Sequence, residues 1–206
     1  MKKILAPIFI TITVASYSQN PIEPVVKSYF RINPFNMRFD NFIAELQKDR
    51  WFKVKTYQPR TDSTFLFMEG TYKYFNPFRF IPEELKFTMI EKEFVHMDSH
   101  ARDTVIYMQL SGITDPGIPN KKVVQKEFNR FHANHSESFQ GYHTYQSFEE
   151  KGKIVAELYN YFISPSVEPI TIAWGSLPET NQYTFTLTIC FKVKQNVVEI
   201  FGPRVF

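Results

Sequence analysis

The sequence predicts an α+β fold built on an antiparallel β-sheet that curves around one or two helices. Three features carry this expectation: a long arm of two-residue alternation near the C-terminus, two segments with the apolar spacing of a helix, and strand-like segments joined by short turns. Successive strands joined by short turns pair antiparallel. A doubly wound parallel sheet is therefore not expected.

The C-terminal arm is the least ambiguous element. From Tyr183 to Lys194, apolar side chains at every second position alternate with threonines, a cysteine and lysines. A period of two sends the two sets to opposite faces of a sheet, so the arm is predicted to be a long strand with one buried and one wetter face. Gln195-Asn196 then turns the chain into a shorter returning strand, Val197 to Phe201.

The first half of the chain is interpreted as one helix and four strands. Residues 19–35 carry three prolines and are predicted to be an extended lead-in. Phe39, Phe42 and Leu46 mark the buried stripe of a helix over 36–50. In the third strand the apolar phase slips from odd to even positions, which indicates a β-bulge. The four strands are expected at 52–55, 66–74, 85–97 and 104–110.

The second half repeats this order. A helix is predicted from Pro119 to about His135, with proline in its favoured first turn and with Val124, Phe128 and Phe131 on its buried side. The segment 154–163 also fits a helical spacing, so both interpretations stay open there. Strands are expected at 142–148, 154–163, 170–174 and in the C-terminal arm.

The order of elements allows two arrangements of a single α+β domain over 36–206. In one, two αβ4 halves, 36–115 and 118–206, each wrap a sheet on a helix. In the other, one continuous sheet covers both helices. The halves do not align residue by residue, so no sequence repeat is inferred.

Residues 1–18 have the character of a cleavable signal peptide. Lys2 and Lys3 precede an apolar run, Ile4 to Ala15, and small residues follow before a cut ahead of Gln19. The run is shorter than the about 20 residues of a membrane-spanning helix. We therefore expect an exported protein, secreted or periplasmic, with no membrane span in the mature chain.

Composition argues against some classes of partner. The formal net charge is +3, and removal of Lys2 and Lys3 would lower it by two, to +1. Nucleic-acid binding calls for a concentrated basic face, which this balance does not predict. The single cysteine, Cys190, excludes an intramolecular disulfide, so stability must come from the core. The 22 Phe and 11 Tyr residues can fill that core or line an apolar cavity.

Three histidines are the strongest candidates for catalytic chemistry. His132 and His135 stand three residues apart on the second predicted helix, and His143 follows eight residues later. Such a set could hold the zinc ion of a metal-dependent hydrolase. However, His135 falls on the same stripe as Phe128 and Phe131, which is typical of a core residue. No Gly-rich phosphate loop or Gly-x-Ser-x-Gly pattern is present, and no catalytic residue is predicted.

The leading hypothesis is an exported binding module that needs no cofactor and is not expected to catalyse a reaction. Its aromatic-lined site would take a small apolar or sugar-like ligand. The alternatives are a cell-envelope interaction or assembly protein, which would dock through an exposed strand edge such as the one after Val197, and the zinc-dependent hydrolase. The residues expected to border the aromatic site are Tyr72, Tyr74, Phe78, Phe80 and Trp174.

Overall fold

The structure is a computed structural model that describes residues 21–95, 102–116, 120–139, 142–163, 169–177 and 179–199. The predicted signal peptide, residues 1–18, lies outside the described residues. The helices are α1 (Ile22–Tyr29), α2 (Phe39–Lys48) and α3 (Lys121–His135), with short 3-10 turns at Pro34–Asn36 and Glu137–Phe139. The strands are β1 (Phe52–Gln58), β2 (Phe67–Tyr72), β3 (Glu84–Val95), β4 (Arg102–Ile113), β5 (His143–Glu150), β6 (Lys153–Tyr161), β7 (Ile170–Leu177), β8 (Gln182–Lys194) and β9 (Val197–Glu199).

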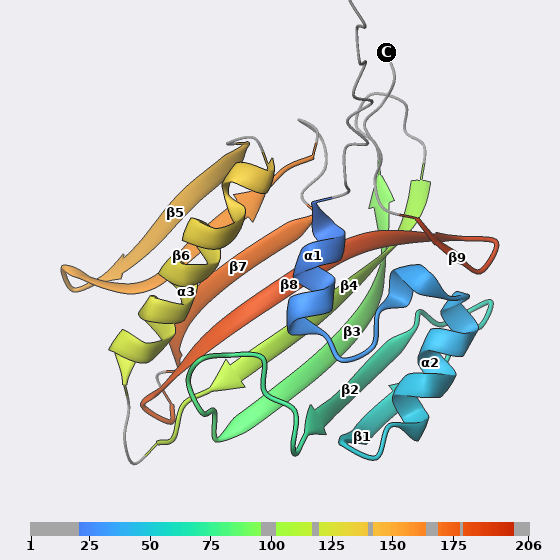
Figure 1. The fold of residues 1–206 in the computed structure, drawn as a ribbon, viewed down its shortest axis with the longest axis horizontal. Helices are drawn as coiled ribbons and strands as arrows, with labels where there is room; N and C mark the ends of the chain where they lie inside the picture. The colour runs from blue at the N-terminus through green and yellow to red at the C-terminus, as the bar shows by residue number, and fades with distance from the viewer. Residues whose placement is uncertain are drawn as a thin grey trace, which may run out of the picture.

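The strands form one antiparallel sheet in the order β1-β2-β3-β4-β8-β7-β6-β5, and β9 pairs with the end of β8. Two four-stranded meanders, β1–β4 and β5–β8, therefore meet side by side at β4 and β8 (Figure 1). Helix α2 precedes the first meander and α3 precedes the second. The expected α+β class is confirmed, and the two arrangements left open by the sequence are combined: each αβ4 unit contributes half of one continuous sheet.

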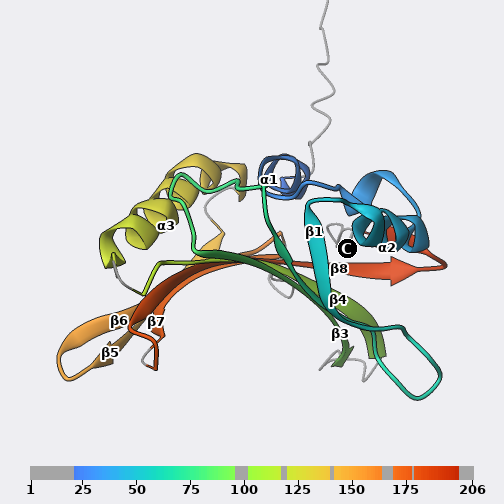
Figure 2. The ribbon, with the colours of Figure 1, turned by 90° about the horizontal axis from the view of Figure 1, so that it is seen from below.

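All three α-helices lie on the same face of the sheet (Figure 2). That face is apolar because the strands send their inward set to it, for example along one row that crosses the seam between the meanders from Phe87 through Leu110 and Leu187 to Ile172. The matching row on the other face contains Thr88, Gln109, Thr188, Thr171 and Asn160. This second face is polar and carries none of the described helices.

Helix α1 corrects the extended lead-in predicted for 19–35. Ile22, Val25, Val26 and Tyr29 are buried at the spacing of one helical stripe, which the prolines obscured in the sequence. Pro21 stands at the N-cap, and the proline at 24 lies in the first turn, where no intrahelical amide bond is lost. In both ribbon views α1 lies between α2 and α3 (Figures 1 and 2).

The β-bulge predicted in the third strand is absent from the described part of β3, where the pairing with β4 runs without a register shift from Glu84 to Val95. The alternation of Leu85, Phe87 and Met89 continues inward with Glu91, which is only 3% exposed. An acidic residue at that position was not expected in the core, and this produced the apparent slip in the sequence. Glu91 is held there by Arg60, at 2.8 Å, and by the amide of Leu66.

Two further local predictions agree with the structure, whereas Pro119, predicted in the first turn of the second helix, lies outside the described residues and α3 begins at Lys121. Residues 153–161 form strand β6, which settles the choice between helix and strand. The turn predicted at Gln195-Asn196 has positive φ at both central residues, as a two-residue hairpin of type I′ requires, and so does the Lys151-Gly152 turn between β5 and β6. None of the helices among the described residues combines the length and apolar character that a membrane-spanning helix needs.

We expect Gly112→Ala to destabilise the fold, because a Cβ at this position would stand 2.7–2.8 Å from the rings of Phe78 and Phe80. Overpacking of this kind costs about 1–3 kcal/mol. Urea unfolding followed by circular dichroism measures the loss. Gly175→Ala is the matched control on β7, since its Cβ would make ordinary contacts with Ala156, at 3.4 Å, and with the carbonyl oxygen of Val155, at 3.9 Å. Equal effects of the two substitutions would contradict the packing described here.

Candidate functional site

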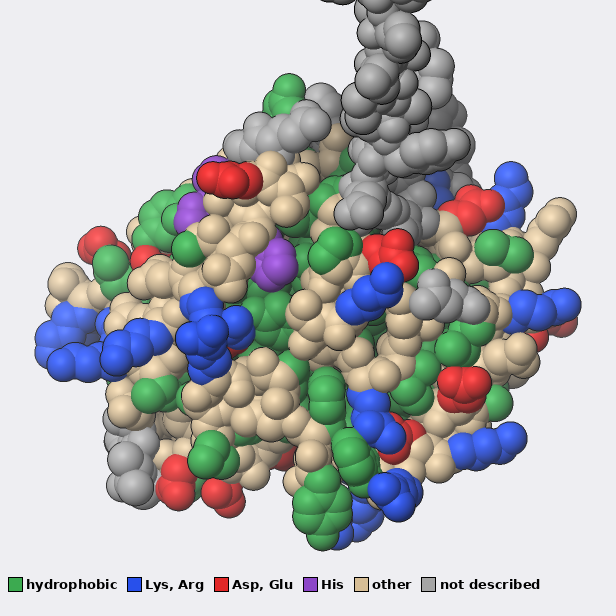
Figure 3. Space-filling model, viewed as in Figure 1, with side chains coloured by type: hydrophobic (Ala, Val, Ile, Leu, Met, Phe, Trp, Pro, Cys, Tyr) green, Lys and Arg blue, Asp and Glu red, His purple; other side chains and the backbone are tan. Residues whose placement is uncertain are grey.

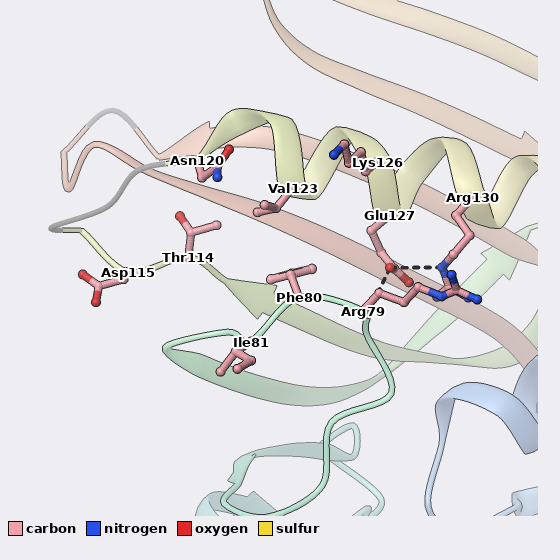
Figure 4. Close-up of a pocket in the computed structure, with 10 residues that line it drawn as sticks. All are labelled: Arg79, Phe80, Ile81, Thr114, Asp115, Asn120, Val123, Lys126, Glu127 and Arg130. Carbon is pink, nitrogen blue, oxygen red and sulfur yellow. Dashed lines mark hydrogen bonds and ion pairs between the residues drawn. The ribbon is translucent and has the colours of Figure 1, made fainter.

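A hollow that combines apolar and charged walls lies between α3 and the loop from residue 73 to 83, which connects β2 to β3. We call this the α3 groove, and we call residues 73–83 the aromatic loop. The groove has a volume of about 790 Å³. It is lined by Arg79, Phe80, Ile81, Thr114, Asp115, Asn120, Val123, Lys126, Glu127 and Arg130 (Figure 4).

The aromatic loop is held in shape by its own side chains. Asn76 accepts a hydrogen bond from the amide of Phe78, at 3.0 Å, and donates one to the carbonyl of Phe80, at 2.8 Å. The Phe78 and Phe80 rings stack with their centroids 5.4 Å apart, and the absent side chain of Gly112 makes room beneath them. The edge of Phe185 supports Phe78 from the sheet. The loop is thus a fixed wall of the groove.

Glu127 anchors the α3 side of the groove. It projects from α3 on the buried stripe, its residue is 2% exposed, and it pairs with Arg130 one turn further on. Its Oε2 also accepts the backbone N–H of Arg79, at 3.2 Å, so it ties the aromatic loop to α3. Arg130 in turn donates to the hydroxyl of Tyr29 on α1, at 2.9 Å. Burial, with the nearby Glu127 carboxylate, raises the pKa of Tyr29 to about 12, so this hydroxyl stays neutral.

The groove lining carries three cationic side chains, Arg79, Lys126 and Arg130, and two acidic ones, Asp115 and Glu127. The Glu127 carboxylate is neutralised by Arg130, whereas the side chains of Arg79 and Lys126 form no ion pair with another described residue. Lys and Arg side chains are visible over the α3 side of the helix-bearing face (Figure 3). Asp115 and Asn120 lie at the opposite end of the groove from Glu127 and Arg130 (Figure 4). Ile81, at 92% exposed, adds an apolar side chain to the rim.

The five aromatic residues predicted to border a ligand site are not gathered in one place. Phe80 lines the α3 groove, with 8% of its surface exposed, and Phe78 lies stacked behind it. Tyr72 is buried against Phe52 in the first meander, and Tyr74 is 77% exposed. Trp174 is buried on β7 in the second meander. A role of these residues in ligand binding remains a prediction.

The three histidines are separated into two environments. His132 stacks on Tyr159 and lies beside His143 of β5, with ring centroids 4.1 and 4.9 Å apart. His135 instead packs on Phe131, with centroids 4.5 Å apart, and contacts Tyr29, as its place on the apolar stripe predicted. Within the described ranges, no group of three His, Cys, Asp or Glu side chains is placed to hold a metal ion.

Sequence reasoning missed Glu127 and the cations around it. A signal for Glu127 was present, because this residue lies three positions after Val124 and four before Phe131, on the buried stripe of the helix. An acid at such a position is expensive to bury without a partner. Arg79, Lys126 and Thr114 gave no comparable signal, since they come from three segments that only the tertiary structure brings together.

Glu127→Ala should lower the free energy of unfolding by about 3 kcal/mol, because it leaves the partly buried Arg130 without its carboxylate. Chemical denaturation measures this loss. The control is Glu23→Ala, which removes an exposed pair with Lys27 and should cost less than about 0.5 kcal/mol. A similar small loss for both variants would show that Glu127 is not an anchor of the groove.

The stability of the fold should fall as the pH drops from about 7 to about 5. Burial lowers the pKa of His132 and of His135, with further contributions from His143 and Arg130 respectively. The unfolded chain has ordinary histidine pKa values of about 6.5, so it binds more protons in this range and is favoured by acid. The double variant His132→Gln, His135→Gln should flatten the dependence of the melting temperature on pH. Asn134→Gln, on the exposed side of α3, should leave it unchanged.

Protein-family models, curated proteins and solved structures give no match to this chain. Function is therefore inferred from the α3 groove and its surroundings.

Proposed function

We propose that the protein is an exported ligand-binding module and that its ligand occupies the α3 groove. The observation that carries this proposal is the combination of an apolar wall, formed by Phe80, Ile81 and Val123, with the cations Arg79 and Lys126, which form no ion pair with another described residue. The volume of about 790 Å³ lies within the range of small-molecule sites, about 300–1,000 Å³. Both walls are built in advance, by Asn76 in the loop and by Glu127 on α3.

The ligand class that fits these walls is a small organic anion with an apolar body. A carboxylate or phosphate would meet Arg79 and Lys126, and its apolar part would lie along Ile81 and Val123. The Glu127 carboxylate does not oppose this, because Arg130 and the Arg79 amide already occupy it. A sugar-like ligand is less well served, since Phe80 exposes only 8% of its surface for stacking.

The direct test compares two probes that share a ten-carbon chain and differ in the sign of their head group. Decanoate should bind and shift the amide resonances of residues 79–81 and 123–130 in an NMR titration. Decyltrimethylammonium should shift them much less at the same concentration. Equal shifts would identify non-specific hydrophobic association and would contradict an anion site.

Charge reversal at the groove should abolish this preference. The double variant Arg79→Glu, Lys126→Glu should weaken decanoate binding at least about tenfold, a loss of about 1.4 kcal/mol. Calorimetric titration measures the affinity. Lys153→Glu is the matched control, an exposed lysine in the β5–β6 hairpin that does not line the groove. An unchanged affinity in the double variant would place the ligand elsewhere.

Export is the part of the proposal that rests on residues 1–18 alone. Their basic start and apolar run support cleavage ahead of Gln19. The intact mass of the protein purified from its own host should correspond to a chain that begins at Gln19. A native mass spectrum of the same sample would reveal a retained small acid as an added mass.

A further inference from the structure

The free edge of β5 is a second feature of the molecule, independent of the α3 groove. This strand is the last in the sheet order, so one of its sides has no neighbour among the described strands (Figure 1). Its residues after His143 are all exposed. Large apolar side chains accompany them: Tyr142, Tyr145 and Phe148 are 62%, 47% and 50% exposed.

The backbone of β5 presents hydrogen-bonding groups to this open side. Tyr142 directs its carbonyl inward, where it accepts the amide of Phe162 at 3.0 Å. Successive residues of a strand direct their N–H and C=O groups to opposite sides. The groups of His143, Tyr145 and Ser147 therefore point outward, ready to pair with another strand.

The opposite edge of the sheet is protected, and β5 is not. Strand β1 carries Lys53 and Lys55 and has a register shift between Val54 and Thr56, which are common devices against edge pairing. Strand β5 contains no lysine and no proline. The register shift in its pairing with β6 skips Val155 and leaves the residues of β5 consecutive. The contrast between the two edges indicates that β5 is kept available.

We propose that β5 pairs antiparallel with β5 of a second copy, about a two-fold axis at Gln146, and so joins two nine-stranded sheets. The charges of the strand select this arrangement. In the antiparallel register Glu149 lies opposite His143 and Glu150 lies opposite Tyr142, whereas a parallel register would place each acid beside its own copy. The pairs in this register are Gln146 with Gln146, Tyr145 with Ser147, Thr144 with Phe148, and His143 with Glu149.

The same register agrees with the faces and hydrogen bonds of the sheet. His143, Tyr145, Ser147 and Glu149 share one face, so each pair keeps its side chains together. The outward groups of His143, Tyr145 and Ser147 fall in hydrogen-bonded pairs with the second copy. Gln146 then stands in a non-hydrogen-bonded pair, with the two Cα atoms about 4.5 Å apart.

Cysteine cross-linking in the full-length protein tests this register. Gln146→Cys should give a disulfide-linked dimer under mild oxidation, since about 4.5 Å lies within the Cα separation of a disulfide. Thr144→Cys is the matched control: the residue is equally exposed on the same edge and face, but stands about 14 Å from its copy in this register. The wild type controls for Cys190, which is buried. Linked dimers from both variants at equal rates, or from neither, would overturn the register.

Sedimentation velocity over a roughly hundredfold range of concentration tests the association itself. The wild type should shift from monomer to dimer. Ser147→Pro should remain monomeric, because it removes an outward N–H and leaves the bonds to β6 intact, while Ser147→Ala should still dimerise. Circular dichroism verifies that the proline variant is folded. A wild type that stays monomeric throughout would overturn pairing with a second copy and leave the edge to an extended segment of another protein.

Discussion

The pairing of β4 with β8 is the interaction on which the structure depends, because it converts two four-stranded meanders into one sheet. The two strands are in register from Val105–Lys192 to Ile113–Thr184. On the helix side, Leu110 and Leu187 belong to the core, and on the polar side Ser111 and Thr186 share a hydrogen bond of 2.9 Å. The joined sheet has one long apolar face for the helices to cover, and neither meander would provide such a face alone. Helix α1 lies between the helices of the two halves and contacts both loop and α3 through Tyr29.

Two buried carboxylates join segments of the chain by accepting backbone hydrogen bonds. Glu127 connects α3 to the aromatic loop, and Glu91 connects β3 to the start of β2 through Leu66. Each has an arginine partner, Arg130 or Arg60, which offsets the cost of removing the charge from water. In each case the acid adds a hydrogen bond to a connection that already contains buried apolar side chains. Glu127 thus connects the two walls of the α3 groove.

The two proposals place different tasks on the second αβ4 unit, a ligand in the α3 groove and a second copy at the β5 edge. The groove uses the side of α3 that faces the aromatic loop of the first unit, so a ligand there touches both halves of the chain. The edge uses backbone groups on the far side of β5, away from the seam. Binding at one place need not disturb the other. No residue of β5 lines the groove, so each of the two features can be changed by mutation on its own.

Local periodicity in the sequence determined most of the elements, because a strand or a helix that buries one face has apolar residues at regular intervals along the chain. The alternation from Tyr183 to Lys194, the stripe of Phe42 and Leu46, and the turn at Gln195-Asn196 all predicted what the structure contains. The fold class followed from them. Helix α1 was missed because its prolines outweighed its apolar stripe, and the bulge in β3 was wrongly predicted because Glu91 interrupts an apolar pattern that it in fact continues.

The tertiary structure alone decided the strand order, the burial of the loop phenylalanines and the position of the groove. Pairing between β4 and β8 joins residues that are distant in the sequence, such as Met108 and Ile189, and no local repeat can reveal such a pair. Phe78 and Phe80 are buried because Gly112, on a different strand, leaves room for them. The lining of the groove comes from the aromatic loop, the end of β4 and α3. Such a site depends on contacts between distant segments, and those contacts are determined by packing and not by periodicity.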